Sequence, residues 1–229
     1  MLVRTFASAV TGIDAVTVTI EVNVSRGVRF FLVGLPDVAV KESQQRIESA
    51  IRSLGFHWPG KQVVINMAPA DIRKEGSSYD LPLAIGVLAA DEKLTSQELE
   101  SYILIGELSL DGSLQPVKGV LPIALRAREE RFKGIIVPAR NSREAAVVEG
   151  LDVYGMENLG DVLGFFNGLK KFEPVKVNLK EIFNGEANKY DVDFGDVRGQ
   201  ENVKRALEVA AAGHHNLIMS DTVLFLCST

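Results

Sequence analysis

Apolar and polar residues alternate along Ala15–Val24, with a valine or isoleucine at every even position of that stretch. A period of two predicts a strand with one buried face and one solvated face. Arg29–Val33 follows a turn signal at Arg26-Gly27 and predicts a second strand. We expect these two strands to pair with each other as a hairpin.

A helical period replaces the alternation after Asp37. Apolar residues recur at helical spacing as far as Leu54, while Asp37 has the side chain of an N-cap and Gly55 is a stop signal. Gln62–Met67 predicts a short buried strand. Asp80–Ala90 is apolar on most of its circumference and predicts a buried helix.

Beyond residue 100 the pattern changes several times between the strand period and the helix period. It predicts, in chain order, a hairpin made of Ile103–Leu110 and Leu114–Val117 joined at Asp111-Gly112, a helix over Leu121–Glu130, a strand over Gly134–Pro138, a helix over Ser142–Glu149, a strand over Asp152–Tyr154 and a helix over Leu159–Asn167. Strands and helices mixed in this way predict an α/β (α+β) domain over residues 1–167.

The C-terminal part of the chain has a different organisation. Residues 168–195 carry scattered charges and little periodicity, which predicts a linker. Residues 196–219 (DVRGQENVKRALEVAAAGHHNLIM) predict a capped amphipathic helix that ends at Gly213 and an apolar run typical of a buried strand. In P-loop ATPases such a strand leads into G-x-x-x-x-G-K-[ST], which holds the phosphates. Residues 220–229 (SDTVLFLCST) contain no glycine or lysine, so we expect no ATP binding by that route.

The composition narrows the classes of protein. A chain of 229 residues with 46% apolar content can bury one substantial core, and its net charge of −5 does not attract nucleic acid over the whole surface. The single cysteine, Cys227, excludes an internal disulfide and suits a reducing compartment. No stretch approaches 18 apolar residues. We therefore expect a cytoplasmic protein without a membrane partner.

The segment DVRGQENVKRALEVAAAGHHNL resembles the start of the AAA+ module in the Mg-chelatase-like ATPases of the ComM/YifB family, and residues 1–167 resemble the Lon-protease-like domain of that family, of the ribosomal-protein-fold type. The resemblance ends at residue 220, where the family has its Walker A loop. It implies an incomplete AAA+ fragment over residues 196–219, truncated before Walker A, and an aberrant tail over 220–229. It also implies a partial adenine pocket at Val197, Gly199 and Gln200, and ATP and Mg as cofactors of the intact parent but not of this chain.

The densest polar cluster of the first domain is DIRKEGSSYD, residues 71–80, between the predicted buried strand and the predicted buried helix. Loops in that position can hold an anion or present a nucleophile. The cluster resembles the serine loop of Lon peptidases, which puts Ser78 at the position of the nucleophile. GELSLDGSLQPVKGVLPIALRA resembles the following Lon segment and puts Leu121 at the position of the catalytic lysine. A leucine accepts no proton, so we expect Ser78 to be vestigial and the chain to be no peptidase.

Each of these residues also has a simpler interpretation. Ser77 or Ser78 would cap the next helix, and Lys118, three residues before Leu121, would lie in a turn rather than act as a replacement base. Arg73 and Lys74 would form a solvated charge pair rather than contact phosphate.

Histidines and aromatic residues give little support for a metal or a base-stacking site. His57 is isolated beside Trp58, and His214 and His215 are adjacent rather than at ligand spacing, so we expect no metal site. Phe56, His57 and Trp58 would stack on a base or, more simply, cover the edge of the core.

Three functions follow from these observations. The first is a non-proteolytic Lon-like interaction or regulatory domain. By resemblance, its intact parent is a hexameric ATP-dependent DNA translocase, a branch-migration factor in recombination and natural transformation, which implies self-association and DNA as partners. The second is a Lon-type Ser-Lys peptidase that uses Ser78. The third is the ATPase subunit of a metal chelatase, against which the Lon-like part of the resemblance argues.

Overall fold

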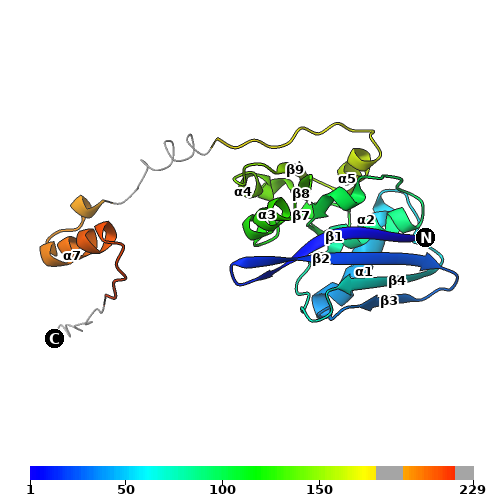
Figure 1. Cartoon of the computed structure of the whole chain (residues 1–229), viewed down its shortest axis with the longest axis horizontal. Coiled ribbons are helices and arrows are strands. Elements are labelled where there is room, and N and C mark those ends of the chain that lie inside the picture. Colours follow the sequence, from blue (N-terminus) through cyan, green and yellow to red (C-terminus); the bar gives the residue numbers. More distant parts are fainter. Residues whose placement is uncertain (179–192, 220–229) are drawn as a thin grey trace, which may run out of the picture. The chain divides into compact units, whose positions relative to one another are not determined.

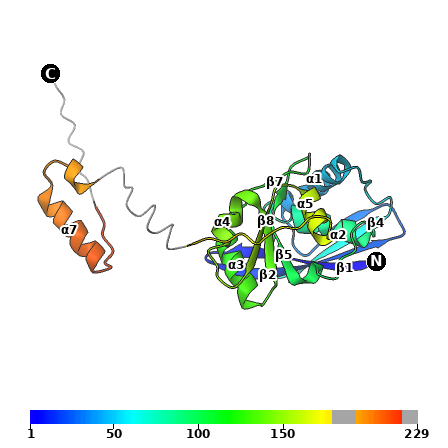
Figure 2. The ribbon, with the colours of Figure 1, turned by 90° about the horizontal axis from the view of Figure 1, so that it is seen from above.

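The structure is a computed structural model that describes residues 1–178 and 193–219. The predicted tail 220–229, with Cys227, and most of the predicted linker lie outside the described residues. The chain forms two compact units, Met1–Asn178 and Leu179–Thr229 (Figures 1 and 2).

The first unit is built around a seven-stranded mixed sheet with the order β3-β4-β2-β1-β5-β8-β9, accompanied by a small β6-β7 hairpin. Its strands are β1 (Leu2–Thr11), β2 (Asp14–Ser25), β3 (Phe30–Val33), β4 (Gln62–Ala68), β5 (Tyr102–Leu104), β6 (Glu107–Leu108), β7 (Leu114–Gln115), β8 (Gly134–Pro138) and β9 (Asp152–Met156). Its α-helices are α1 (Val38–Ser53), α2 (Asp80–Ala90), α3 (Val120–Glu129), α4 (Ser142–Ala145) and α5 (Leu159–Phe166), with short 3-10 helices at Leu99–Ser101 and Ala139–Asn141. The predicted α/β fold is confirmed.

The pairing of the N-terminal strands differs from the prediction. β2 pairs along its length with β1, antiparallel across the turn at Gly12, and β3 pairs in parallel with β4. The predicted hairpin between Ala15–Val24 and Arg29–Val33 is therefore wrong, although both strands form. The sequence signal was misleading because β1 reads ASAVT at its end, where small and polar residues hide its period.

Helices cover both faces of the sheet. The Thr5 hydroxyl donates to the Pro82 carbonyl of α2 at 3.1 Å, whereas the ring of the next residue, Phe6, lies 5.3 Å from the ring of Phe132, just after α3. Successive residues of a strand point to opposite faces, so α2 and α3 cover opposite faces of β1. α1 packs against α2 in turn.

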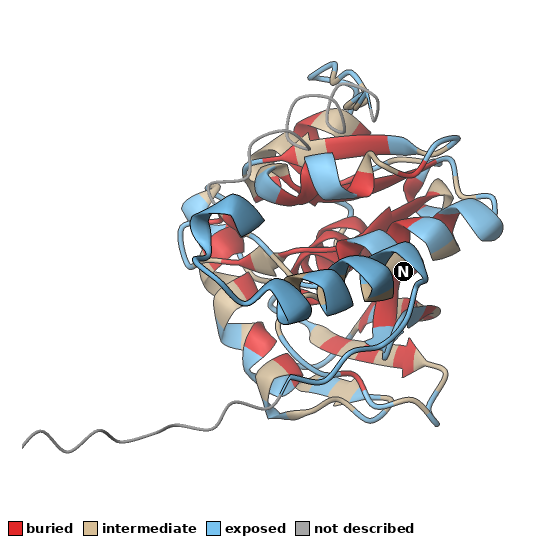
Figure 3. Cartoon of the chain, turned by 90° about the vertical axis from the view of Figure 1, so that its left-hand side faces the viewer, coloured by how far each residue is buried: buried red, intermediate tan, exposed pale blue. Residues whose placement is uncertain are grey.

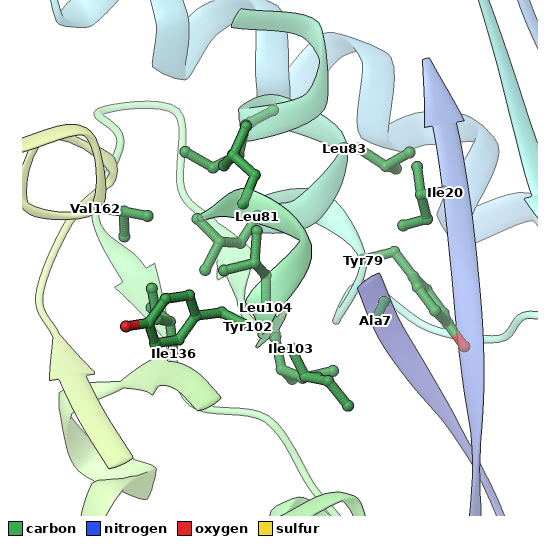
Figure 4. Packing of buried hydrophobic residues seen from close by; sticks show 14 of the residues in the cluster. Ala7, Ile20, Tyr79, Leu81, Leu83, Tyr102, Ile103, Leu104, Ile136 and Val162 are labelled. Atoms are coloured by element: carbon green, nitrogen blue, oxygen red, sulfur yellow. The ribbon is translucent and has the colours of Figure 1, made fainter. Parts of the chain in front are cut away.

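The core lies between the sheet and these helices. Every residue of α2 is buried, as its apolar composition predicts, and α1 buries only one side. Figure 3 shows the buried residues concentrated in the strands and inner helices of the first unit. Figure 4 shows part of the cluster, in which residues of α2 pack with residues of the strands: Leu81 and Leu83 from the helix, and Ala7, Ile20, Ile103, Leu104 and Ile136 from the sheet.

The local signals for α1 and for the second hairpin are confirmed. The Asp37 side chain accepts a hydrogen bond from the Val40 N–H at 2.8 Å, and Gly55 follows the helix with a φ of +81°. The β6-β7 hairpin turns at Asp111-Gly112 as predicted. The first residues of the predicted strand Ile103–Leu110 belong to β5, which does not join the hairpin. β5 lies in the large sheet, parallel to β1 and β8.

The first compact unit continues past the predicted boundary at Asn167. The Lys170 ammonium pairs with Asp161 at 2.7 Å, and the Val175 N–H donates to the Val153 carbonyl of β9 at 2.8 Å. Residues 168–178 therefore pack on the first unit, and the prediction that they belong to a linker is corrected.

The second unit contains one 3-10 helix (Phe194–Asp196) and α7 (Glu201–Ala212) among its described residues. α7 ends at Gly213 as predicted, but its N-cap residue Gln200 has a φ of 62° and no side-chain cap, so the predicted capping is wrong. The residues after His215 form no strand within the described range, and Ile218 is 95% exposed. The predicted buried strand is therefore not found within residues 216–219. In the parts of the chain that are described, no helix combines the length and apolarity needed to cross a membrane.

Candidate functional site

The polar loop of residues 71–80 lies between β4 and α2, as predicted, and is held by backbone hydrogen bonds. Lys74 forms a parallel bridge with Pro36: its N–H donates to the Leu35 carbonyl at 3.2 Å and its carbonyl accepts from the Asp37 N–H at 3.0 Å. The Asp37 carboxylate, which caps α1, also accepts from the Gly76 N–H at 3.1 Å. The loop is therefore fastened to the segment that leads into α1.

Neither serine of the loop caps α2. The Ser77 hydroxyl donates to the Glu107 carboxylate, and α2 has Tyr79 at its N-cap without a side-chain hydrogen bond. The Ser78 carbonyl accepts from the Gly106 N–H at 3.0 Å, and the half-buried Ser78 hydroxyl has no hydrogen-bond partner among the described residues. The prediction that one of these serines caps α2 is wrong, because the Ser77 hydroxyl bonds instead to the Glu107 carboxylate on β6.

A buried ion pair lies directly beside the serines. Asp80, which is fully buried, accepts two hydrogen bonds from the Arg46 guanidinium at 2.7 and 2.9 Å and a third from the Leu108 N–H at 3.2 Å. Burial raises the pKa of the Asp80 carboxyl, while the bonds from Arg46 and Leu108 act in the opposite direction. The Asp80 carboxylate in turn raises the pKa of Arg46. This pair ties α1, α2 and β6 together at the base of the loop.

The sequence interpretation missed the Arg46–Asp80 pair. An aspartate that opens an otherwise apolar, buried helix needs a partner, because an unpaired buried charge is costly. Asp80 carried that signal, but the helical pattern of α1 did not indicate that Arg46 would be its partner.

The predicted solvated pair of Arg73 and Lys74 is corrected in part. Arg73 is exposed and pairs with Glu75 at 3.2 Å. Lys74 is fully buried, and its ammonium donates to the Pro69 carbonyl. Burial lowers the pKa of Lys74, with the charge of Asp71 acting in the opposite direction. The two neighbouring cations thus occupy opposite environments, because the bridge to Pro36 fixes the loop with position 74 inward.

The position predicted for a catalytic lysine holds no base. Leu121 lies in the first turn of α3, and its N–H donates to the Glu144 carboxylate at 3.2 Å. Lys118 is exposed in the turn that precedes α3, as predicted. Throughout residues 1–178, no hydrogen bond joins Ser78 to either residue. Among the residues that the structure describes, no base is hydrogen-bonded to the Ser78 hydroxyl to take its proton.

The residues predicted for an adenine pocket belong to the second unit. Val197, Gly199 and Gln200 are exposed and form the turn that enters α7, where Gly199 and Gln200 have positive φ. Residues 193–219 include no phosphate-binding loop, so these three residues do not by themselves fit ATP, and no step through ATP is derived from them.

The remaining predicted residues have structural positions. The Trp58 ring lies 6.0 Å from the Phe30 ring and packs, with Phe56, against the core, while His57 is exposed. Trp58 and Phe56 therefore cover the edge of the core, as the simpler interpretation predicted. Among the described residues there is no group of three or more histidine, cysteine, aspartate or glutamate side chains placed to hold a metal ion.

Family models match a segment in each of the two units. A family model described as "Subunit ChlI of Mg-chelatase" matches residues 20–141, more than half of the chain, and one described as "Magnesium chelatase, subunit ChlI" matches residues 193–222. The two matched segments fall in different compact units.

Individual relatives extend this similarity over most of the chain. Competence protein ComM of Haemophilus influenzae is 41% identical over 214 residues, which cover 93% of this chain and 42% of ComM. YifB of Escherichia coli is 40% identical over 212 residues, 92% of this chain and 41% of YifB. Lon protease 2 of Bacillus subtilis is 25% identical over 124 residues, 54% of this chain and 22% of that protease. The chain spans about two fifths of the length of the ComM and YifB proteins that it matches, and it belongs to the ComM/YifB family of Mg-chelatase-like proteins.

Proposed function

We propose that residues 1–178 form a non-proteolytic, Lon-like interaction and regulatory domain of a Mg-chelatase-like AAA+ protein. The observation that carries the proposal is the surroundings of Ser78: its hydroxyl has no described partner, and Leu121 stands where the resemblance places the lysine. A serine without an adjacent base is a weak nucleophile. In this proposal the contacts of Asp37 and of the Arg46–Asp80 pair hold the shape of the loop rather than support peptide hydrolysis.

The same proposal covers the protein to which this domain belongs. One relative is named a competence protein, which supports a role in natural transformation, and we extend the proposal to the handling of DNA in recombination. In this proposal the protein self-associates as a hexamer, uses ATP and Mg through a complete AAA+ module, and moves along DNA. Val197, Gly199 and Gln200 would border the adenine of that ATP.

Active-site labelling tests the non-proteolytic assignment. The full chain is treated with a fluorophosphonate probe, alongside Ser78→Ala and, as a matched control, Ser77→Ala. We expect no labelling that depends on Ser78. Labelling that disappears in Ser78→Ala and persists in Ser77→Ala would show an activated Ser78 and reject the assignment.

Two measurements test the proposed partners. Mobility-shift assays with single-stranded DNA at increasing salt should show binding that weakens as salt rises, because phosphate contacts release counterions. Sedimentation velocity over a concentration series should show self-association. A monomer that shifts no DNA at low salt contradicts both parts.

A metal-chelatase subunit is the second candidate, favoured by the description of the matching family models. Magnesium insertion into a porphyrin by the full-length protein, in the presence of the other chelatase subunits, distinguishes it from the DNA-handling role.

A further inference from the structure

The charges of the first unit are unevenly distributed along the chain. Residues 118–150 contain seven lysines and arginines and four glutamates, whereas the whole chain has a net charge of −5. This segment forms α3, β8, the 3-10 helix Ala139–Asn141 and α4. A protein that is acidic overall still attracts a polyanion where positive charge is locally in excess. The segment 118–150 carries such an excess.

Two of the seven cations are engaged with glutamates. The Arg126 guanidinium pairs with Glu129 at 3.4 Å and with Glu130 at 2.6 Å. The Lys133 ammonium pairs with Glu98 at 2.9 Å. Because Arg126 takes both glutamates at the end of α3, these acids do little to neutralise the remaining cations of the segment.

The other five cations are exposed, and their side chains have no hydrogen bond or ion pair within residues 1–178 and 193–219. They are Lys118, Arg128, Arg131, Arg140 and Arg143, which we call the basic face. Charged side chains on a surface usually find a partner of opposite sign nearby or are diluted among acids. Neither holds for the basic face, so its charge remains available to a ligand.

The N-terminal end of α3 adjoins the start of α4. The Asn141 side chain accepts from the Val117 N–H and donates to the Val117 carbonyl, each at 2.9 Å. Lys118 follows Val117 and Arg140 precedes Asn141, so this pair of bonds makes Lys118 and Arg140 neighbours. Arg143 lies in α4, directly after. Three members of the basic face therefore gather at this end.

The C-terminal end of α3 adjoins the residues that follow α4. The Arg131 N–H donates to the Arg128 carbonyl at 3.0 Å. A Cβ placed on Gly150 would lie 3.9 Å from the Cδ atom of Arg128. Figures 1 and 2 both show α3 and α4 side by side. The five cations thus lie along one surface made by α3 and the segment of α4.

Two acids of the α4 segment lie near this surface. The Glu144 carboxylate accepts from the Leu121 N–H at 3.2 Å and from the Asn141 amide at 3.4 Å, which uses part of its charge. Glu149 is exposed, and its side chain has no partner in the described part of the chain. Five cations against two carboxylates leave the surface positive.

We propose that the basic face holds the phosphate backbone of a DNA strand. The inference rests on the proposed function for DNA as the partner, to which it assigns a surface. Four of the five cations are arginines, whose planar guanidinium fits a phosphate with two parallel hydrogen bonds. α3 has ten residues and is about 15 Å long, and a strand of B-DNA carries a phosphate about every 3.4 Å along its axis. Several successive phosphates therefore fall within the length of the basic face.

Fluorescence anisotropy with a labelled single-stranded oligonucleotide tests this surface in the full chain. A fourfold variant that changes Arg128, Arg131, Arg140 and Arg143 to glutamine should bind at least about tenfold more weakly at low salt. The matched control changes Arg26, Arg29, Lys41 and Lys93 to glutamine, four exposed cations outside the basic face whose side chains also have no described partner. Both variants lose the same net charge, so general repulsion affects them equally. Equal binding by the two variants overturns the inference.

The salt dependence of binding counts the phosphate contacts. For single strands, the logarithm of the binding constant falls with the logarithm of salt concentration by about 0.7 per contact. Contacts from all five cations predict a slope of about −3.5 for wild type and for the control, and about −0.7 for the fourfold variant of the basic face. A slope that changes equally in both variants contradicts the proposal.

Removing a negative charge gives an expectation in the opposite direction. Glu149→Gln should tighten binding about twofold, because it removes an acid beside the basic face. Glu100→Gln is the control, since Glu100 is exposed in the 3-10 helix Leu99–Ser101 and should leave binding as in wild type. Circular dichroism checks the fold of each variant, and if the fourfold variant is unfolded this pair decides. No gain for Glu149→Gln over Glu100→Gln overturns the inference.

Two further outcomes separate this inference from the proposed function. If wild type binds DNA and the fourfold variant of the basic face binds as wild type does, the surface is wrong and DNA binding stands. If wild type binds no DNA at low salt, the DNA part of the proposed function fails together with the surface. Competition with polyglutamate identifies the partner: displacement of the oligonucleotide as effective as by unlabelled DNA of equal charge shows a surface for an acidic polypeptide and rejects DNA.

Discussion

Replacing Asp80 with alanine should destabilise the first unit more than any exposed ion-pair change, because it leaves Arg46 without its partner. Asp80 is fully buried and accepts three hydrogen bonds, and 21% of the Arg46 side chain is exposed. Removing one partner of a buried pair costs about 3–5 kcal/mol. The partial exposure of Arg46 lets water reach the orphaned cation, so we expect the lower end, about 3 kcal/mol.

Urea denaturation of the full chain measures this loss. With an m-value of about 2.5 kcal/mol per molar urea, a loss of about 3 kcal/mol moves the midpoint down by about 1.2 M. The matched control is Arg4→Ala, which breaks the exposed Arg4–Glu21 pair, 51% and 31% exposed, and should cost at most about 1 kcal/mol. The double variant Arg46→Met/Asp80→Leu should be more stable than Asp80→Ala, because neither position then carries an unpaired charge. Midpoints for Asp80→Ala and Arg4→Ala that coincide would refute the reasoning.

Three further predictions concern the loop and its attachment. At pH 7, Lys74→Met should unfold at a higher urea concentration than wild type, because the buried ammonium opposes folding. Burial lowers the pKa of Lys74 in the folded state, so the stability of wild type should rise as pH rises through that pKa towards the unfolded value of about 10.4. The difference in urea midpoint between wild type and Lys74→Met should therefore become smaller over that pH range. A difference that does not change with pH contradicts this prediction. Gly34→Ala should cost about 3 kcal/mol or more, measured by thermal unfolding, since Gly34 has a φ of +104° and a Cβ there would lie 2.1 Å from the Met67 carbonyl oxygen. Asp37→Ala should cost about 1–2 kcal/mol, by loss of the cap on Val40, with Asp37→Asn closer to wild type; equal unfolding midpoints for the two variants would contradict the capping role.

Local patterns predicted those elements whose burial follows from their own residues. The alternation in β2, the cap at Asp37 and the mostly apolar composition of α2 are each complete within one short segment, and each element forms as expected. Pairings between segments were less predictable. β3 joins β4 rather than β2, since the choice depends on β1, whose own period is weak.

In the candidate site, too, local features were predictable from the sequence and contacts between distant segments were not. The placement of loop 71–80 between a strand and a helix was predicted, and so was the turn at Lys118. The burial of Lys74 and the bond from Ser77 to Glu107 were not, because both depend on contacts with distant segments, the Pro36 bridge and β6. The ATP, Mg and DNA assignments and the role of Ser78 stay predictions.

The packing of residues 168–178 has a practical consequence for producing the first unit by itself. A fragment cut at Asn167 would lose the Val175 bond to β9 and the Lys170 bond to Asp161, and Phe165 would lose the neighbouring Phe172 ring, 6.3 Å away. Such a fragment would have an uncovered edge strand on each side of its sheet, β3 and β9. Chains with two uncovered edge strands tend to associate edge to edge into polymers. A fragment that ends at Asn178 keeps the Lys170 and Val175 bonds, so the outer side of β9 stays covered.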